Sequence, residues 1–113
     1  MNEIAVQYHN TSIGEFIIGS YDGRLCLLDF RYRNLRKIVD ERIKKGLQAS
    51  FVEKNTDIIK ETQKHLDAYL SGERKSFDLP ILLLGNEFQK QVWNTLLGIL
   101  MELQLLIKIL LKR

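Results

Sequence analysis

Three short apolar runs joined by tight turns constrain the fold of this chain more than any other feature of its sequence. Residues Glu3–Tyr8, Glu15–Ser20 and Leu25–Phe30 each have the composition of a β-strand. The second and third runs flank Asp22-Gly23, a pair that favours the positive φ angles of a hairpin turn. Consecutive strands with such short connections pair in antiparallel fashion. The sequence therefore predicts a three-stranded antiparallel meander with one face that needs a cover.

An amphipathic helix over Glu53–Leu70 is the expected cover for the meander. Its apolar residues recur at spacings of three and four, and Ser71-Gly72 follows as a typical helix stop. The preceding segment, residues 31–51, carries many charges with scattered apolar residues, and Gly46 is expected to end a short helix within it. This charge run predicts a solvated helix face rather than a nucleic-acid patch.

A further helix is predicted after an extended piece at Phe77–Leu84, in which Pro80 disfavours helix immediately before it. Asn86 supplies an N-cap, and Gln89 stands three residues later in the capping-box position. The apolar residues of this helix form one stripe. They are Phe88, Val92, Trp93, Leu96 and Leu97.

Three ordered stretches of the chain carry a family resemblance. Residues 11–30 read TSIGEFIIGSYDGRLCLLDF, residues 66–80 read LDAYLSGERKSFDLP, and residues 85–99 read GNEFQKQVWNTLLGI. In this order they resemble the O6-alkylguanine-DNA alkyltransferases, also called methylated-DNA–protein-cysteine methyltransferases. The resemblance implies an α/β (α+β) fold with a ribonuclease-H-like N-terminal domain over residues 1–84. Residues 85–113 are then expected to hold the first helix of a truncated catalytic domain, followed by an aberrant apolar tail.

In the family that this chain resembles, the catalytic domain carries the chemistry. A helix-turn-helix binds the DNA minor groove and flips the damaged base, and the cysteine of a Pro-Cys-His-Arg motif accepts the alkyl group irreversibly. This sequence contains neither that motif nor the family's recognition helix, stack-filling arginine or hinge asparagine. We therefore expect a truncated member that is inactive alone and has no catalytic, cofactor-binding or metal-binding residues. We also expect that it does not bind DNA strongly.

The sequence changes character after Ile99. Where the family continues PYGxxxSYxxLA, residues 100–113 read LMELQLLIKILLKR. Codons exist for these residues that spell PYGTTTSYKDLAKK when read one nucleotide earlier, so residues 100–113 are interpreted as a frameshifted stretch of an alkyltransferase gene. Such a segment has no evolved packing partner, and we expect its apolar stripe to make the chain a homodimer. Glu102, Gln104 and Lys108 interrupt the stripe, which argues against a membrane span.

Few polar residues of the predicted strands and helices suggest a catalytic or metal-binding role. The single cysteine, Cys26, lies among leucines and is expected to be a packing residue rather than a nucleophile. One cysteine excludes an internal disulfide and fits a reducing cytoplasm, which is the predicted location. His9 and His65 have no second ligand at metal-binding spacing and are interpreted as surface residues. Glu15 and Asp29 are isolated carboxylates, too few for a ribonuclease-H centre.

Two other functions stay open beside the truncated alkyltransferase. One is a binding or regulatory module that pairs with a separately made catalytic half, and the other is an active enzyme with an unrelated mechanism. The enzyme is disfavoured because no paired carboxylates, ligand clusters or phosphate loops stand out. Phe88 and Trp93 are interpreted as core anchors and not as platforms on which DNA bases stack. The turn Glu73-Arg74-Lys75 is interpreted as solvated. The net charge of +3 permits nucleic-acid contact without arguing for it.

Overall fold

The computed structural model describes residues 2–71, 98–99, 101–106 and 108–109. Its strands and helices are β1 (Glu3–Thr11), β2 (Gly14–Tyr21), β3 (Arg24–Phe30), α1 (Arg36–Leu47), β4 (Ser50–Glu53) and α2 (Asp57–Leu70). Residues 98–99, 101–106 and 108–109 are also helical and are called the C-terminal helical segment below. The features predicted within residues 72–97, including the domain boundary after residue 84, lie outside the described residues. The predicted solvated turn Glu73-Arg74-Lys75, the predicted N-cap Asn86 and the predicted core anchors Phe88 and Trp93 lie outside them as well.

The predicted meander of three antiparallel strands is confirmed. β1 pairs with β2 from Ala5↔Ser20 to Thr11↔Gly14, and β2 pairs with β3 in the same sense. The turn between β2 and β3 places Asp22 at φ 53° and Gly23 at φ 73°, both positive, as an Asp-Gly pair favours. Local turn chemistry therefore sets the register of this half of the sheet.

The sheet has a fourth strand that the sequence did not predict. β4 lies beside β1 and runs parallel to it, with the register Glu3↔Ser50 to Val6↔Glu53, so the described sheet is mixed and has the order β3-β2-β1-β4. The prediction of a wholly antiparallel three-stranded sheet is wrong in this respect. The four residues of β4 read SFVE, with two adjacent apolar residues, and so do not show the alternation that predicts a strand.

The predicted covering helix is confirmed, but it begins later than expected. Glu53 belongs to β4, and α2 starts at Asp57 after Thr56, whose Oγ1 accepts a hydrogen bond from the Ile59 N–H at 3.3 Å. Thr56 is thus the N-cap of α2. In α1, the predicted stop at Gly46 is one residue early, because the helix runs to Leu47 and Gln48 closes it in a left-handed conformation.

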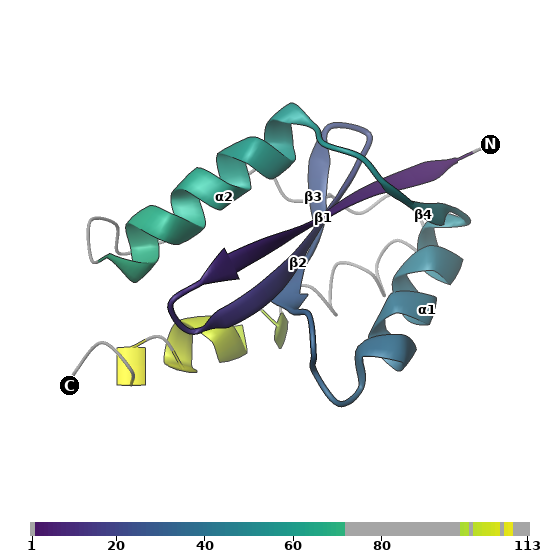
Figure 1. Cartoon of the computed structure of the whole chain (residues 1–113). Coiled ribbons are helices and arrows are strands. Elements are labelled where there is room, and N and C mark those ends of the chain that lie inside the picture. Colours follow the sequence, from purple (N-terminus) through teal and green to yellow (C-terminus); the bar gives the residue numbers. More distant parts are fainter. Residues whose placement is uncertain (1, 72–97, 100, 107, 110–113) are drawn as a thin grey trace.

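Both faces of the sheet are covered, where the sequence predicted a cover for one (Figure 1). α2 packs on one face, and its apolar cluster also includes residues of the C-terminal helical segment. The α2-side cluster contains Ala5, Phe16, Ile18, Leu25, Leu28, Ile58, Ile59, Leu66, Ile99 and Leu103. The α1-side cluster contains Ile4, Val6, Ile17, Cys26, Leu27, Ile43 and Leu47. A sheet buried on both sides loses simple alternation in its strands.

A β-bulge in β3 explains the unbroken apolar run of that strand. Gly19 pairs with Leu27 and Ser20 pairs with Leu25, so Cys26 is an extra residue in the ladder. As a result Cys26 and Leu27 both lie in the α1-side cluster, whereas Leu25 lies in the other. Gly19 permits the close approach, since a Cβ there would lie 3.0 Å from the Cβ of Leu27.

Candidate functional site

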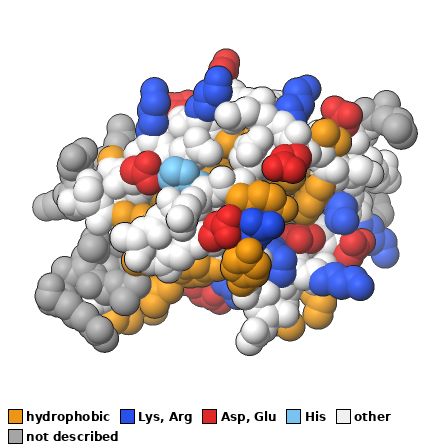
Figure 2. Space-filling view, in the orientation of Figure 1, with side chains coloured by type: hydrophobic (Ala, Val, Ile, Leu, Met, Phe, Trp, Pro, Cys, Tyr) orange, Lys and Arg blue, Asp and Glu red, His pale blue; other side chains and the backbone are white. Residues whose placement is uncertain are grey.

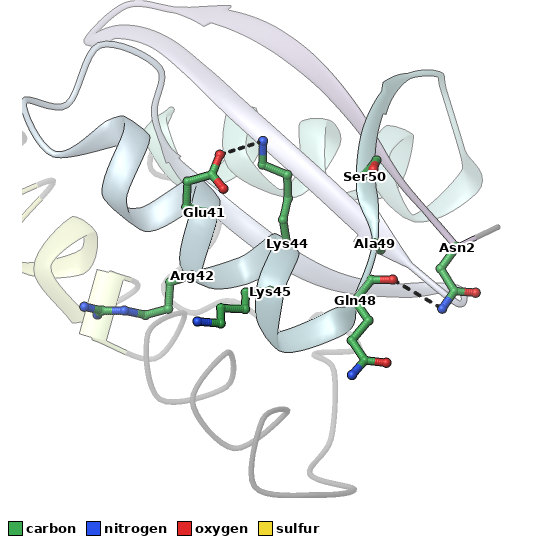
Figure 3. A pocket seen from close by; sticks show the side chains of 8 residues that line it. All are labelled: Asn2, Glu41, Arg42, Lys44, Lys45, Gln48, Ala49 and Ser50. Atoms are coloured by element: carbon green, nitrogen blue, oxygen red, sulfur yellow. Dashed lines mark hydrogen bonds and ion pairs between the residues drawn. The ribbon is translucent and has the colours of Figure 1, made fainter.

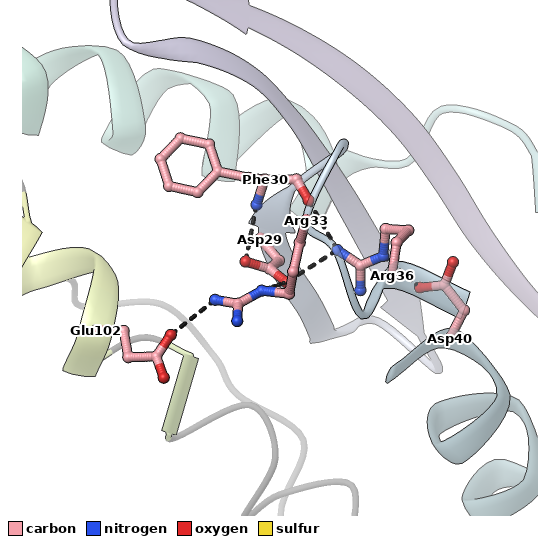
Figure 4. Close-up of polar contacts among 6 residues, drawn as sticks. All are labelled: Asp29, Phe30, Arg33, Arg36, Asp40 and Glu102. Carbon is pink, nitrogen blue, oxygen red and sulfur yellow. Dashed lines mark hydrogen bonds and ion pairs between the residues drawn. The ribbon is translucent and has the colours of Figure 1, made fainter. Parts of the chain in front are cut away.

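The most unusual polar group of the described residues is the carboxylate of Asp29, which is fully buried at the end of β3 (Figure 4). Its Oδ2 lies 2.6 Å from Arg33 Nε and 2.9 Å from Arg36 Nη1. Its Oδ1 accepts a hydrogen bond of 2.8 Å from the Phe30 N–H. A buried charge is tolerated only with such partners. Asp29, interpreted from sequence as isolated, is therefore the centre of an ion-pair network.

The network continues from Asp29 in two directions (Figure 4). On α1, Arg36 Nε donates to Asp40 Oδ1 at 2.7 Å, and burial raises the pKa of Asp40 above its ordinary value while Arg36 opposes that rise. On the other side, Arg33 Nη2 donates to Glu102 Oε2 at 2.7 Å. The hydrogen bond that Arg33 donates to Glu102 raises the pKa of Arg33. The network thus connects β3, α1 and the C-terminal helical segment, and in it two guanidinium groups pair with three carboxyl groups.

The C-terminal helical segment packs on the sheet through one of its faces. Leu103 is 1% exposed and Ile99 is 6% exposed, and both belong to the α2-side cluster. The expectation that the apolar residues after Ile99 lack a packing partner is therefore wrong for Leu103. Met101 and Leu105 are 71% and 62% exposed, so the opposite face points to solvent.

Cys26 is fully buried, as the sequence predicted. Burial raises the pKa of its thiol to about 12, so the reactive thiolate is a negligible species near neutral pH. The bulge of β3 turns this side chain toward the sheet face that α1 covers. Its position supports packing and not nucleophilic chemistry.

The charge run of residues 31–51 forms only part of a solvated face. Arg36 and Asp40 are mostly buried, with side chains 15% and 18% exposed, whereas Lys45 is exposed. An open hollow lies at the end of α1 and is lined by Asn2, Glu41, Arg42, Lys44, Lys45, Gln48, Ala49 and Ser50 (Figure 3). Within it the Lys44 ammonium lies 3.0 Å from Glu41 Oε1. Positive and negative side chains are likewise interspersed on the face that Figure 2 shows.

The two histidines were interpreted as surface residues, but both are half-buried. His9 Nε2 lies 2.7 Å from Asp67 Oδ1, which ties β1 to α2, and His65 has a side chain only 12% exposed. In the described ranges, no group of three or more His, Cys, Asp or Glu residues is arranged to hold a metal ion. Nor does any helix of these ranges have the length and hydropathy to cross a membrane.

Glu15, the other strand carboxylate considered from the sequence, is paired at the surface. Its Oε1 lies 2.9 Å from Arg31 Nη1, and the guanidinium carbon of Arg31 is 3.7 Å from the centroid of the Tyr8 ring. Glu15 and Asp29 therefore serve separate ion pairs. Sequence reasoning did not identify Arg33, Arg36 or Asp40 as part of a site. The available signal was a carboxylate in an apolar strand, which needs a cationic partner when it is buried.

Comparisons with known proteins point to one family. Residues 4–83 match a family model described as "6-O-methylguanine DNA methyltransferase, ribonuclease-like domain". Curated relatives named methylated-DNA–protein-cysteine methyltransferase include one from Methanosarcina acetivorans, 49% identical over 47 residues, which cover 42% of this chain and 30% of the relative. One from Methanosarcina mazei is 41% identical over 64 residues, which cover 57% of this chain and 39% of the relative.

A constitutive methylated-DNA–protein-cysteine methyltransferase from Bacillus subtilis is 34% identical over 86 residues, which cover 76% of this chain and 48% of that protein. The chain thus spans less than half the length of these curated relatives. No solved structure matches the chain.

Proposed function

The chain belongs to the 6-O-methylguanine DNA methyltransferase family through its ribonuclease-like domain, and from this premise we propose that it is a non-catalytic part of an alkyltransferase. The relatives are named for transferring a methyl group from DNA to a protein cysteine. In our proposal this chain does not itself accept an alkyl group from O6-alkylguanine. It supplies the structural domain against which a helix of the catalytic part packs.

The observation that carries this proposal is the burial of Cys26. It is the single cysteine of the sequence, and hence the one thiol to which an alkyl group could be transferred here. Its side chain has no exposed surface, and its pKa is raised to about 12. An acceptor thiol must be a thiolate and must be reached by an extruded base. Cys26 meets neither requirement.

Mass spectrometry tests the proposal directly. The purified chain is incubated with duplex DNA containing O6-methylguanine, and the mass of the intact protein and of the peptide containing Cys26 is measured. We expect no gain of a methyl group, because the thiol is inaccessible and protonated. A Bacillus subtilis relative serves as the positive control. Stoichiometric methylation of Cys26 would refute the proposal.

A second candidate function is a module that pairs with a separately made catalytic half. The packing of the C-terminal helical segment on the α2-side cluster supports it, because the domain already holds a helix through side-chain contacts. Mixing the chain with a fragment that carries the catalytic domain of a relative tests it. Methyl transfer in the mixture above that of the fragment alone is the expected result, and no increase would refute it.

The exposed apolar stripe of the C-terminal helical segment supports the proposal of a homodimer. Met101, Leu105 and Ile109 lie at spacings of four on one helical face and are all more than half exposed. Such a stripe favours self-association. Light scattering at increasing concentration is expected to give the mass of two chains, and Leu105→Gln is expected to restore a monomer. A monomer of the unchanged chain at high concentration would refute the dimer.

We further propose that DNA binding is weak. Two of the five cations of α1 pair with acids of the same helix, as Arg36–Asp40 and Lys44–Glu41, and the net charge of the whole sequence is only +3. Non-specific DNA binding requires uncompensated cations that neutralise phosphates. Anisotropy of a labelled duplex at physiological salt is expected to show no saturation at micromolar protein. Saturable submicromolar binding would contradict this.

We retain the frameshift as the proposed origin of residues 100–113, on the basis of their recoding to PYGTTTSYKDLAKK, and the cytoplasm as the proposed location. Sequencing the gene is expected to find codons for Pro-Cys-His-Arg downstream in the neighbouring frame, and their absence would refute the frameshift. Cell fractionation is expected to recover the chain with cytoplasmic markers, and recovery with secreted proteins would refute that location.

A further inference from the structure

We propose that the ribonuclease-like domain carries a socket for an amphipathic helix supplied by another polypeptide. The socket is the part of the α2-side cluster that receives Ile99 and Leu103, together with the guanidinium of Arg33. In this structure the chain's own C-terminal helical segment fills it. The recognised pattern is an apolar residue at position i, a carboxylate at i+3 and an apolar residue at i+4, which here are Ile99, Glu102 and Leu103.

The apolar half of the socket holds the helix by burial. Ile99 is 6% exposed, and Leu103, about one helical turn later, is 1% exposed. Met101, which lies between them, and Leu105, which follows them, are largely exposed. Only one stripe of the helix therefore enters the α2-side cluster. Removal of this stripe would leave apolar cluster residues open to water, an arrangement that favours a replacement helix.

The polar half of the socket is the guanidinium of Arg33, which a residue of the domain itself orients. Arg33 Nε lies 2.6 Å from the buried carboxylate of Asp29, which orients the guanidinium, and Arg33 Nη2 reaches Glu102 Oε2 at 2.7 Å. An oriented cation loses less side-chain entropy when it binds a carboxylate. It also repels a helix that presents Lys or Arg at the same position.

All of these contacts are made by side chains within five successive residues of the helix. None of them requires a main-chain connection to the sheet. A separate helix with the same pattern can therefore present the same groups. The socket is independent of whether Cys26 accepts an alkyl group, so its test stands apart from the methyl-transfer assay.

The first experiment measures how the segment is held in the full chain. Hydrogen exchange of the amides of residues 98–109 is compared in the unchanged protein, Arg33→Gln, Glu102→Gln and the double variant. We expect Glu102→Gln to speed exchange about threefold, as for a partly exposed ion pair. Arg33→Gln should speed it at least as much, because this change also removes a partner of the buried Asp29. The double variant should exchange no faster than Arg33→Gln alone. Glu41→Gln, which removes the Lys44 pair on α1, is the matched control and should leave these amides unchanged.

The second experiment tests docking in trans. The probe is a fluorescent peptide of residues 96–109 in which Met101→Gln, Leu105→Gln and Ile109→Gln remove the outward apolar stripe. Its anisotropy is followed with full-length Leu103→Asp, in which the chain's own segment is displaced, and with the unchanged protein. Binding to the variant is expected to be at least tenfold tighter than to the unchanged protein. A further Glu102→Lys change in the peptide should weaken binding about tenfold, and Leu103→Ala in the peptide about a hundredfold.

Circular dichroism checks that the Leu103→Asp protein keeps the sheet and α2. If the Leu103→Asp protein does not fold, full-length Glu102→Lys is used in its place. Equal binding to the unchanged and opened proteins would overturn the proposal, because the peptide would then be bound elsewhere. Binding insensitive to both Glu102→Lys and Leu103→Ala in the peptide, or no binding at all, would overturn it as well.

Discussion

Arg33 joins the buried Asp29 to the exposed Glu102, because its Nε lies 2.6 Å from Asp29 and its Nη2 lies 2.7 Å from Glu102. One guanidinium thus serves a carboxylate with no exposed surface and another whose side chain is 65% exposed. Asp29 also holds Arg36, the first residue of α1. The end of β3 therefore connects the sheet both to α1 and to the C-terminal helical segment.

Replacing Asp29 by Ala should lower the free energy of unfolding by about 3 kcal/mol. The change leaves Arg33 and Arg36 without their shared buried counter-charge, and removing one partner of a buried pair is strongly destabilising. Urea denaturation followed by circular dichroism gives the value. Asp67→Ala, which removes a largely exposed carboxylate paired with His9, is the control and should cost less than about 1 kcal/mol. Equal losses for the two variants would contradict the assigned role of Asp29.

Cys26 should resist alkylation in the folded protein. With its pKa raised to about 12 from 9.0, its thiolate fraction at pH 8 falls by about a thousandfold, and the side chain is not accessible. Iodoacetamide labelling, measured by mass spectrometry, is expected to be at least that much slower than in concentrated urea. Rapid labelling without denaturant would show that the bulge of β3 opens readily.

Gly19→Ala should destabilise the sheet by about 1–3 kcal/mol. The added Cβ would lie 3.0 Å from the Cβ of Leu27, and overpacking in a filled core forces backbone shifts. Gly98→Ala is the matched control, since nothing lies within 4 Å of a Cβ at that helical position, and it should stabilise by about 0.5–1 kcal/mol. Urea denaturation of both variants measures the difference. A loss of stability at Gly98 would contradict the exposed position assigned to it.

Asp40 should give the protein a pH-dependent stability. Burial raises its pKa, so the folded chain binds a proton there more readily than the unfolded chain does. The stability from this group is fully present below the unfolded pKa and is lost as the pH rises through the folded pKa. The unfolding free energy of the unchanged protein minus that of Asp40→Asn should therefore fall as the pH is raised from acid toward neutral. Urea unfolding across that range tests the sign, and a rising difference would contradict it.

Most of the meander could be predicted from the sequence because its determinants are local. The Asp22-Gly23 turn and the neighbouring apolar runs act within a few residues of one another. β4 could not be predicted, because its four residues carry little pattern and its partner β1 lies more than forty residues away in the sequence. The bulge of β3 could not be predicted either, because only the pairing with β2 shows that Cys26 is an extra residue.

The polar network shows a second limit of sequence reasoning. A carboxylate within LCLLDF indicates a buried charge, but nothing local identifies which of the nearby cations approaches it. Arg33 lies in the connection before α1, and its other partner, Glu102, is 69 residues away. The burial of Leu103 depends equally on a distant surface. Resemblance named the family, whereas the contacts of residues 98–109 required three-dimensional placement.

The parallel pairing of β1 with β4 has a consequence for synthesis of the chain. β1 can pair with β2 once Tyr21 has left the ribosome, but its other edge along Glu3–Val6 stays open until β4, ending at Glu53, has left it as well. During that interval the nascent chain presents an unpaired strand edge, the kind of surface that invites association with other chains. Closing it requires contacts of high sequence separation, which form slowly. Completion of the sheet is therefore a late event, and α1, which connects β3 to β4, must be synthesised before it can occur.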